Sequence, residues 1–133
     1  MASKEMQNLI KMMKLMMEQD GMPKFTGQID PVKMRAIIET AQKNMPIEPG
    51  VTFEPTKFGD MYAELAIPED PRKDAIIVYM HGGGLICGDA FSSRGYSSLL
   101  AAETKIPVYA FSYRLAPEHP FPAAPEDCYT AAK

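Results

Sequence analysis

The sequence predicts an α/β fold in which two buried strands are joined by a crossover helix. Residues 75–80 form a continuous apolar run of the length of a strand that is buried on both faces of a parallel sheet, and residues 108–113 predict another buried strand. Between them lie a glycine-rich turn and a helical pattern that Pro107 prevents from continuing. Strand, turn, helix and strand in this order form a βαβ unit, whose crossover is right-handed by the usual rule.

The remaining elements of this α/β segment follow from turn and capping residues. The crossover helix is expected to begin at Ser92 or Ser93, either of which can cap its first turn, and to extend to Lys105. Ahead of the βαβ unit, residues 51–58 and 61–67 predict an antiparallel hairpin that turns at Gly59 and Asp60. After a proline-rich loop, residues 123–133 predict the start of another helix.

Residues 1–45 predict a helical segment that is distinct from the α/β segment, residues 46–133. From Ser3 onward, apolar residues recur at helical spacing, and five of them between positions 6 and 17 are methionines. This apolar face either packs on the protein itself or covers a binding pocket. A second helix is expected to start at Asp30 and Pro31 and to end near Asn44, before a linker rich in proline.

Composition excludes several classes of function. The 133 residues are 46% hydrophobic, enough for one core, and carry 14 basic against 17 acidic side chains without a basic block, which argues against nucleic acid as a partner. No apolar run approaches the roughly 18 residues that a membrane helix needs. Two cysteines and no recognisable signal peptide predict a reduced, cytoplasmic protein. No organic cofactor or metal ion is expected.

The run His81-Gly82-Gly83-Gly84 directly follows the first buried strand and suggests an anion site. Glycines lack the side chain that would keep a reacting oxygen away from the main chain, so consecutive glycines allow backbone N–H groups to point at an anion. A phosphate loop is disfavoured, because neither Gly-Lys-Ser/Thr nor the spacing G-x-G-x-x-G is present. The run therefore favours an anion or oxyanion role over a simple tight turn.

A second motif, YRLAPEHPFPAA at residues 113–124, gives the glycine run its context. Together the HGGG run and this motif closely resemble the hormone-sensitive-lipase-like family of α/β-hydrolase esterases, whose members carry both in this order. The resemblance covers most of residues 50–133, and residues 1–45 are similar in kind to that family's N-terminal cap helices. It implies the N-terminal part of an α/β-hydrolase sheet and a serine carboxylesterase that acts on short-acyl esters.

The resemblance also implies a role for each residue of the glycine run. The N–H groups of Gly83 and Gly84 would stabilise the tetrahedral oxyanion, one such donor being worth about 3 kcal/mol in the transition state. His81 and Gly82 would support the loop, and His81 is not expected to act as the base. Leu85 stands where the family usually has an aromatic residue, which is expected to alter the shape of the acyl pocket.

The sequence departs from the family by lacking a nucleophile. No Gly-x-Ser-x-Gly turn is present, and the nucleophile, acid and base of the family follow later in the chain. Cys87 is expected to be a small buried hydrophobe, and His119 is expected to be structural. The serines without a nucleophile context are Ser92, Ser93, Ser97, Ser98 and Ser112.

These absences predict an N-terminal fragment, truncated before the nucleophile turn, that is inactive alone. Residues 75–80 would then form an exposed sheet edge that recruits a complementary C-terminal fragment or a second copy of the chain. The alternative is a non-catalytic module that uses the glycine run as an anion or ligand pocket and its methionine-rich helix to dock a partner.

Overall fold

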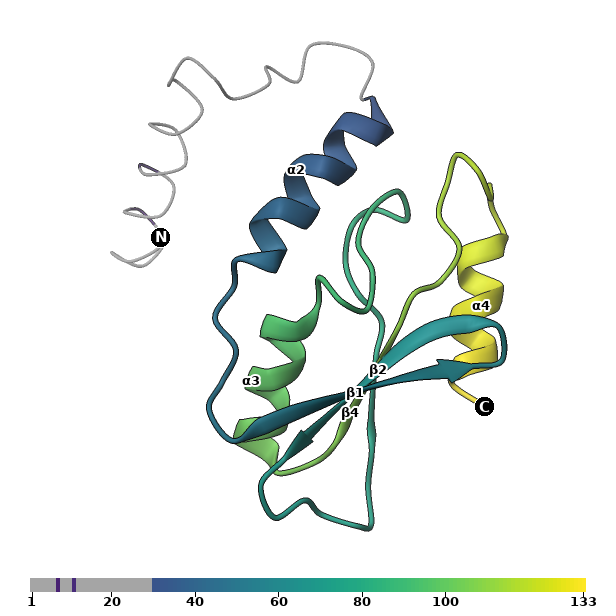
Figure 1. Cartoon of the computed structure of the whole chain (residues 1–133). Helices are drawn as coiled ribbons and strands as arrows, with labels where there is room; N and C mark the ends of the chain where they lie inside the picture. The colour runs from purple at the N-terminus through teal and green to yellow at the C-terminus, as the bar shows by residue number, and fades with distance from the viewer. Residues whose placement is uncertain (1–6, 8–10, 12–29) are drawn as a thin grey trace.

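The computed structural model describes residues 7, 11 and 30–133, which form a four-stranded mixed sheet with helices around it (Figure 1). The strands are ordered β1-β2-β4-β3 across the sheet. In chain order the elements are α2 (Pro31–Lys43), β1 (Val51–Phe58), β2 (Met61–Pro68), β3 (Ile77–Tyr79), α3 (Arg94–Thr104), β4 (Val108–Phe111) and α4 (Ala123–Ala131). Apart from Gln7 and Lys11, the helix expected from Ser3 lies outside the described residues.

The predicted hairpin and βαβ unit are both confirmed. β1 pairs with β2 in antiparallel register, with Phe58 opposite Met61, and Gly59 provides the positive φ of +57° at the first position of the two-residue turn. β2 pairs with β4 in antiparallel fashion, whereas β3 and β4 run parallel and are connected through α3. Pro55 lies within β1, where an edge strand tolerates its missing N–H.

The prediction that residues 75–80 form a strand buried on both faces is wrong. β3 comprises only three residues, and Ile76, Val78 and Met80 are 55, 38 and 42% exposed. Ile77 and Tyr79 pack against the core on the α3 side, so the strand is covered on one face only. Within the described residues β3 lies at the end of the sheet, and the side chains on its other face remain partly exposed.

The crossover helix α3 begins at Arg94, but its capping differs from the prediction. Ser93 occupies the N-cap position without a side-chain capping bond, because its hydroxyl donates instead to the carbonyl of Asp89 at 2.7 Å. The helix ends at Thr104, followed by Lys105 in the left-handed conformation. Its buried residues are small: Gly95, Ser97, Ser98 and Ala101. Small residues allow a close approach, and a Cβ atom at Gly95 would lie 2.6 Å from that of Met45.

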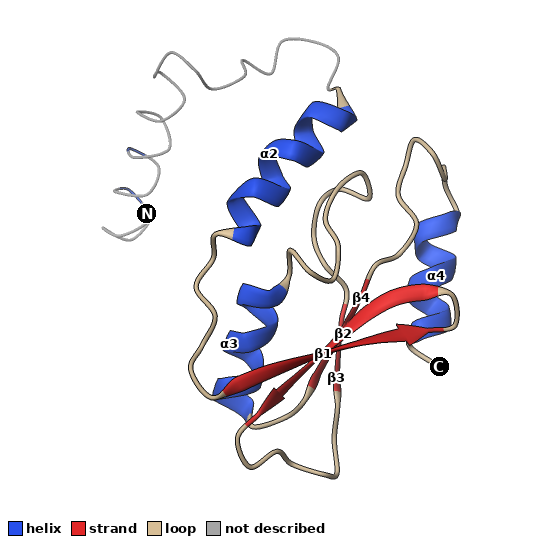
Figure 2. Cartoon of the chain, in the orientation of Figure 1, coloured by secondary structure: helices blue, strands red, loops and turns tan. Residues whose placement is uncertain are grey.

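The other two helices begin near their expected positions. Asp30 caps α2 as predicted, since its carboxylate accepts a hydrogen bond from the amide of Lys33 at 3.3 Å. α4 covers the face of the sheet opposite α3, as Figure 2 shows. No helix in the described part of the chain is long and apolar enough to cross a membrane.

Two small cores, one on each face of the sheet, hold these layers together. On the α4 side, Ala63 and Phe111 lie opposite each other on β2 and β4 and are fully buried. On the α3 side, Ala66 and Val108 form the corresponding buried pair, with Ala101 of α3 against them. Alternation along β2 thus sends successive side chains to opposite cores.

A buried ion pair fixes the start of α3 against β2. The Glu64 carboxylate is 1% exposed and accepts two hydrogen bonds from the Arg94 guanidinium, at 2.5 and 2.8 Å. The hydroxyl of Tyr62 donates to the same carboxylate at 2.5 Å. Arg94 also lies 4.3 Å from the ring centroid of Phe91, so its charge is satisfied on several sides.

We expect the Glu64→Ala variant to lose about 3 kcal/mol of unfolding free energy, because it leaves a partly buried guanidinium without its partner. The matched control is Glu54→Ala on the exposed side of β1, which should cost less than about 0.5 kcal/mol. Urea denaturation measures both variants. Equal losses would contradict a structural role for this ion pair.

Candidate functional site

The glycine run leaves β3 and folds into a compact turn. The carbonyl oxygen of Gly83 accepts hydrogen bonds from the amides of Ile86 and Cys87, at 3.2 and 3.3 Å, and from the Cys87 thiol at 3.0 Å. Gly84 and Leu85 follow with positive φ angles of +62° and +61°. The Gly83 carbonyl is therefore held on the inner side of the turn.

The turn requires glycine at two positions. Gly83 has a φ of +139°, and a Cβ atom there would collide with the carbonyl of Cys87. Gly88 has a φ of +96°, and a Cβ atom there would lie 2.5 Å from Nδ1 of His81. Gly82 and Gly84, by contrast, have no atom within 4 Å of an added Cβ. A side chain would therefore collide with neighbouring atoms at Gly83 and Gly88, whereas Gly82 and Gly84 face open space.

The carbonyls of the turn determine where its amides point. In a trans peptide the C=O and N–H groups lie in one plane and point in opposite directions, so an inward carbonyl of Gly83 turns the N–H of Gly84 outward. The carbonyl of Gly82 accepts from Nδ1 of His81 at 3.0 Å, which fixes the peptide plane that carries the N–H of Gly83. No hydrogen bond among the described residues uses either of these two amides as a donor.

Tyr113 supports the glycine run from the end of β4. Its hydroxyl donates to the carbonyl of His81 at 2.5 Å, and its ring stacks on the imidazole with centroids 4.0 Å apart. Burial raises the pKa of Tyr113 to about 12, so the hydroxyl keeps its proton and remains a donor. The first residue of the YRLAPEHPFPAA motif therefore holds the first residue of HGGG.

Two further contacts join the motifs. The amide of Ala116 donates to the carbonyl of Leu85 at 2.9 Å, so the proline-rich loop lies against the glycine turn. From α2, Arg35 donates to the carbonyls of Ile86 and Ala116, at 2.5 and 2.6 Å, and forms a two-pronged ion pair with Glu118. The site is thus built from three segments that are distant in sequence.

His81 is buried and uncharged. It is 4% exposed, and burial lowers its pKa below the ordinary value of 6.5. Since Nδ1 faces the carbonyl of Gly82, it carries the proton and donates a hydrogen bond to that carbonyl. In the neutral ring Nε2 is then a hydrogen-bond acceptor. Within the described residues Nε2 has no hydrogen-bond partner.

The side chains considered as nucleophiles are engaged elsewhere or buried. Cys87 is 1% exposed, and burial raises the pKa of its thiol, so a reactive thiolate is disfavoured. Ser92 and Ser93 donate to Asp89, Ser98 donates to Gly95, and Ser112 accepts from the amide of Ala90. The hydroxyl of Ser97 is buried without a partner in the described part of the chain, within α3.

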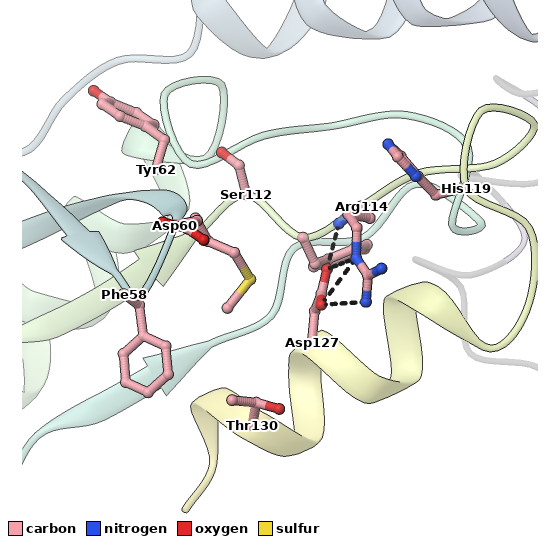
Figure 3. Close-up of a pocket in the computed structure, with 11 residues that line it drawn as sticks. Phe58, Asp60, Tyr62, Ser112, Arg114, His119, Asp127 and Thr130 are labelled. Carbon is pink, nitrogen blue, oxygen red and sulfur yellow. Dashed lines mark hydrogen bonds and ion pairs between the residues drawn. The ribbon is translucent and has the colours of Figure 1, made fainter.

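A pocket of about 690 Å³ lies beside the hairpin turn and α4 (Figure 3), and its lining includes Tyr113 but no residue of the glycine run. Its lining includes Phe58, Tyr62 and His119, so the structure places His119 here. On its wall Arg114 binds Asp127, with a shortest distance of 2.8 Å, and this pairing lowers the pKa of the Asp127 carboxyl. The ion pair ties the end of β4 to α4.

Sequence reasoning did not identify Arg35 or the supporting role of Tyr113. Tyr113 belongs to a motif that the sequence does reveal, but its hydrogen bond to His81 spans 32 residues. Arg35 and Glu118 are separated by 83 residues, and no local pattern marks Arg35 among the charged residues of α2. Only the packing of α2 against both loops brings these groups together.

The chain is similar to α/β hydrolases in sequence. Residues 77–133 match a family model described as the alpha/beta hydrolase fold. The chain is 34% identical over 110 residues to "Tuliposide A-converting enzyme b1, amyloplastic" of Tulipa gesneriana, a match that covers 77% of this chain and 28% of that enzyme. It is 41% identical over 61 residues to the hormone-sensitive lipase of Mus musculus, covering 46% of this chain and 8% of the lipase.

Solved structures show the same similarity in fold. An esterase/lipase from an uncultured bacterium superposes with a TM-score of 0.80 at 27% identity, covering 98% of this chain and 42% of that one. A hormone-sensitive lipase from a metagenome library gives a TM-score of 0.79 at 28% identity, covering 95% and 40%. The chain therefore spans less than half the length of these relatives.

We expect Gly83→Ala to lower the unfolding free energy by roughly 3 kcal/mol, because the added Cβ meets the Cys87 carbonyl at an unfavourable φ. Gly82→Ala is the matched control, since its Cβ would enter open space, and it should stay within about 1 kcal/mol of wild type. Urea denaturation of both variants measures the difference. Equal stability of the two would show that the turn is not closed as described.

Stability should also fall as His81 becomes protonated. Because burial lowers the pKa of His81 in the folded state, the unfolded chain takes up this proton more readily. The contribution of neutral His81 to the unfolding free energy is therefore complete above pH 6.5 and declines as the pH falls below it. Urea midpoints at pH 7.5, 6.5 and 5.5 should drop more steeply for wild type than for His81→Gln. Parallel pH profiles would contradict the assignment of a buried neutral imidazole.

Proposed function

We propose that this chain, which belongs to the hormone-sensitive-lipase-like family of α/β-hydrolase esterases, supplies the oxyanion hole of a serine carboxylesterase that acts on short-acyl esters. The observation that carries the proposal is the orientation of two peptide planes. The carbonyls of Gly82 and Gly83 are held within the turn, so the N–H groups of Gly83 and Gly84 are free to meet an external acceptor.

The chemistry of ester cleavage requires such donors. When a nucleophile adds to the ester carbonyl, negative charge develops on the carbonyl oxygen, and fixed N–H groups stabilise that oxygen more strongly than the neutral carbonyl. Because the turn is already closed by Gly83 and Gly88, little reorganisation is needed as the charge forms. In the family the amide after the nucleophilic serine would join these two donors.

We place the nucleophile, acid and base outside residues 1–133. The sequence contains no Gly-x-Ser-x-Gly turn, and four of the five serines considered act as hydrogen-bond partners of the backbone. The proposed activity therefore requires a second polypeptide segment that carries the catalytic serine and histidine.

The open edge of β3 is the proposed contact for that segment. Within the described residues β3 is the last strand of the sheet, and the side chains of Ile76, Val78 and Met80 in and beside it are exposed. An unpaired strand edge next to exposed apolar side chains recruits another strand. Without the complementary segment, a second copy of this chain would occupy the edge. The two free cysteines, Cys87 and Cys128, fit the proposed reducing cytoplasmic location.

A non-catalytic anion-binding module is the second candidate. It is favoured by the same free amides together with the lack of a nucleophile turn in the sequence. It differs in requiring no second segment, so binding of a small carboxylate by this chain alone would be its complete function.

Complementation tests the esterase proposal. With p-nitrophenyl butyrate as substrate, the chain alone should show no turnover, and addition of a family C-terminal segment carrying the Gly-x-Ser-x-Gly turn and histidine should restore it. Gly84→Val should lower the restored kcat by about 100-fold, because the valine side chain would occupy the space in front of the N–H groups of Gly83 and Gly84. Sedimentation should show the chain forming a one-to-one complex with that segment.

The matched control is Gly59→Val. Gly59 and Gly84 have similar φ angles, +57° and +62°, and open space around an added Cβ, but Gly59 lies in the hairpin turn. Equal restored activity in the two variants would refute the oxyanion role. Saturable binding of butyrate to the chain alone, with no turnover on complementation, would favour the binding module instead.

A further inference from the structure

Arg35 binds the backbone of both motif loops from a third segment. Its Nε donates to the carbonyl of Ile86 at 2.5 Å, and one Nη donates to the carbonyl of Ala116 at 2.6 Å. Both Nη atoms also reach the Glu118 carboxylate, at 2.7 and 2.6 Å. Figure 1 places α2, which carries Arg35, beside the loop that follows β3.

The guanidinium is well held by its partners. The Arg35 side chain is 20% exposed, and Glu118 in front of it is 51% exposed. The hydrogen bonds from Arg35 lower the pKa of the Glu118 carboxyl to about 2, so the pair stays charged at neutral pH. A planar fork can serve two carbonyls and a carboxylate together, whereas a lysine ammonium presents a single point of charge.

The contact with Ile86 continues through two peptide planes into the turn formed by residues 82–87, here called the oxyanion turn. The plane that carries the Ile86 carbonyl also carries the N–H of Cys87, and this N–H donates to the carbonyl of Gly83 at 3.3 Å. The Gly83 carbonyl shares its own plane with the N–H of Gly84, on the opposite side. The Arg35 guanidinium at the Ile86 carbonyl therefore orients and polarises a series of hydrogen-bonded peptide groups that ends at the outward N–H of Gly84.

We propose that Arg35 is a positioning residue for the oxyanion turn, acting through the carbonyls of Ile86 and Ala116 to orient the N–H of Gly84. This role rests on the proposed function of the turn. It links the N-terminal helical segment to the site, because the packing of α2 places the guanidinium between the two loops. Glu118 orients Arg35 and contributes through it.

Amide hydrogen exchange on the full chain tests the anchoring without any activity. In Arg35→Ala, the amides of Ile86, Cys87 and Ala116 should exchange about 10-fold faster, because their hydrogen-bonded turn loses its external anchor. The amides of the β1–β2 hairpin should be unchanged. Arg35→Lys should show the same change to a smaller extent, and it replaces the alanine variant if that variant does not fold.

Arg72→Ala is the matched control. Arg72 forms a comparable two-pronged ion pair with Asp74, but this exposed pair touches neither loop. Its removal should leave the exchange of all three reporter amides unchanged. Unaltered exchange in Arg35→Ala, or acceleration that is equal in the hairpin, would overturn the proposal.

Kinetics of the complemented enzyme separate positioning from general destabilisation. Arg35→Ala should lower kcat about 10-fold with little change in KM, because a displaced oxyanion donor affects the transition state more than substrate binding. Wild-type kcat in this variant would overturn the positioning role. Absence of activity in the wild-type complex would refute the proposed function, while the exchange experiment would still decide whether Arg35 anchors the turn.

Discussion

The site depends on the inward orientation of two carbonyl groups. Gly82 and Gly83 direct their carbonyls to groups of the turn itself, and peptide geometry then turns the N–H groups of Gly83 and Gly84 outward. This arrangement requires a proton on Nδ1 of His81, which donates to the carbonyl of Gly82, while burial of the ring disfavours the charged form. It also explains why a Cβ atom is excluded at Gly83, where the chain closes on Cys87.

The forces that stabilise this turn come from distant parts of the chain. Tyr113 follows β4, and its position depends on the pairing of β4 with β2 and β3. Arg35 depends on the position of α2. The sheet and the helical segment therefore both contribute contacts that hold the turn in place, as the proposed oxyanion role requires.

Local chemistry in the sequence was sufficient to predict much of the fold. The hairpin followed from Gly59, and the start of α2 followed from Asp30, because each feature is determined within a few residues. The short length of β3 was not predictable from its apolar residues, since Ile76, Val78 and Met80 remain partly exposed. Apolar periodicity does not reveal the buried face of α3, because that face consists of small residues such as Gly95 and Ser98 rather than large apolar ones. The glycine run could be located from its motif, whereas Arg35 required the tertiary structure.

A crystal structure of the complemented enzyme, with a phosphonate ester bound to its catalytic serine, tests the proposed oxyanion role of Gly83 and Gly84 directly. The phosphonyl oxygen stands in for the oxyanion of the tetrahedral intermediate. We expect this oxygen to lie about 2.7–3.1 Å from the backbone nitrogens of Gly83 and Gly84. A phosphonyl oxygen bound elsewhere, with these two N–H groups donating to the protein itself, would contradict the oxyanion role.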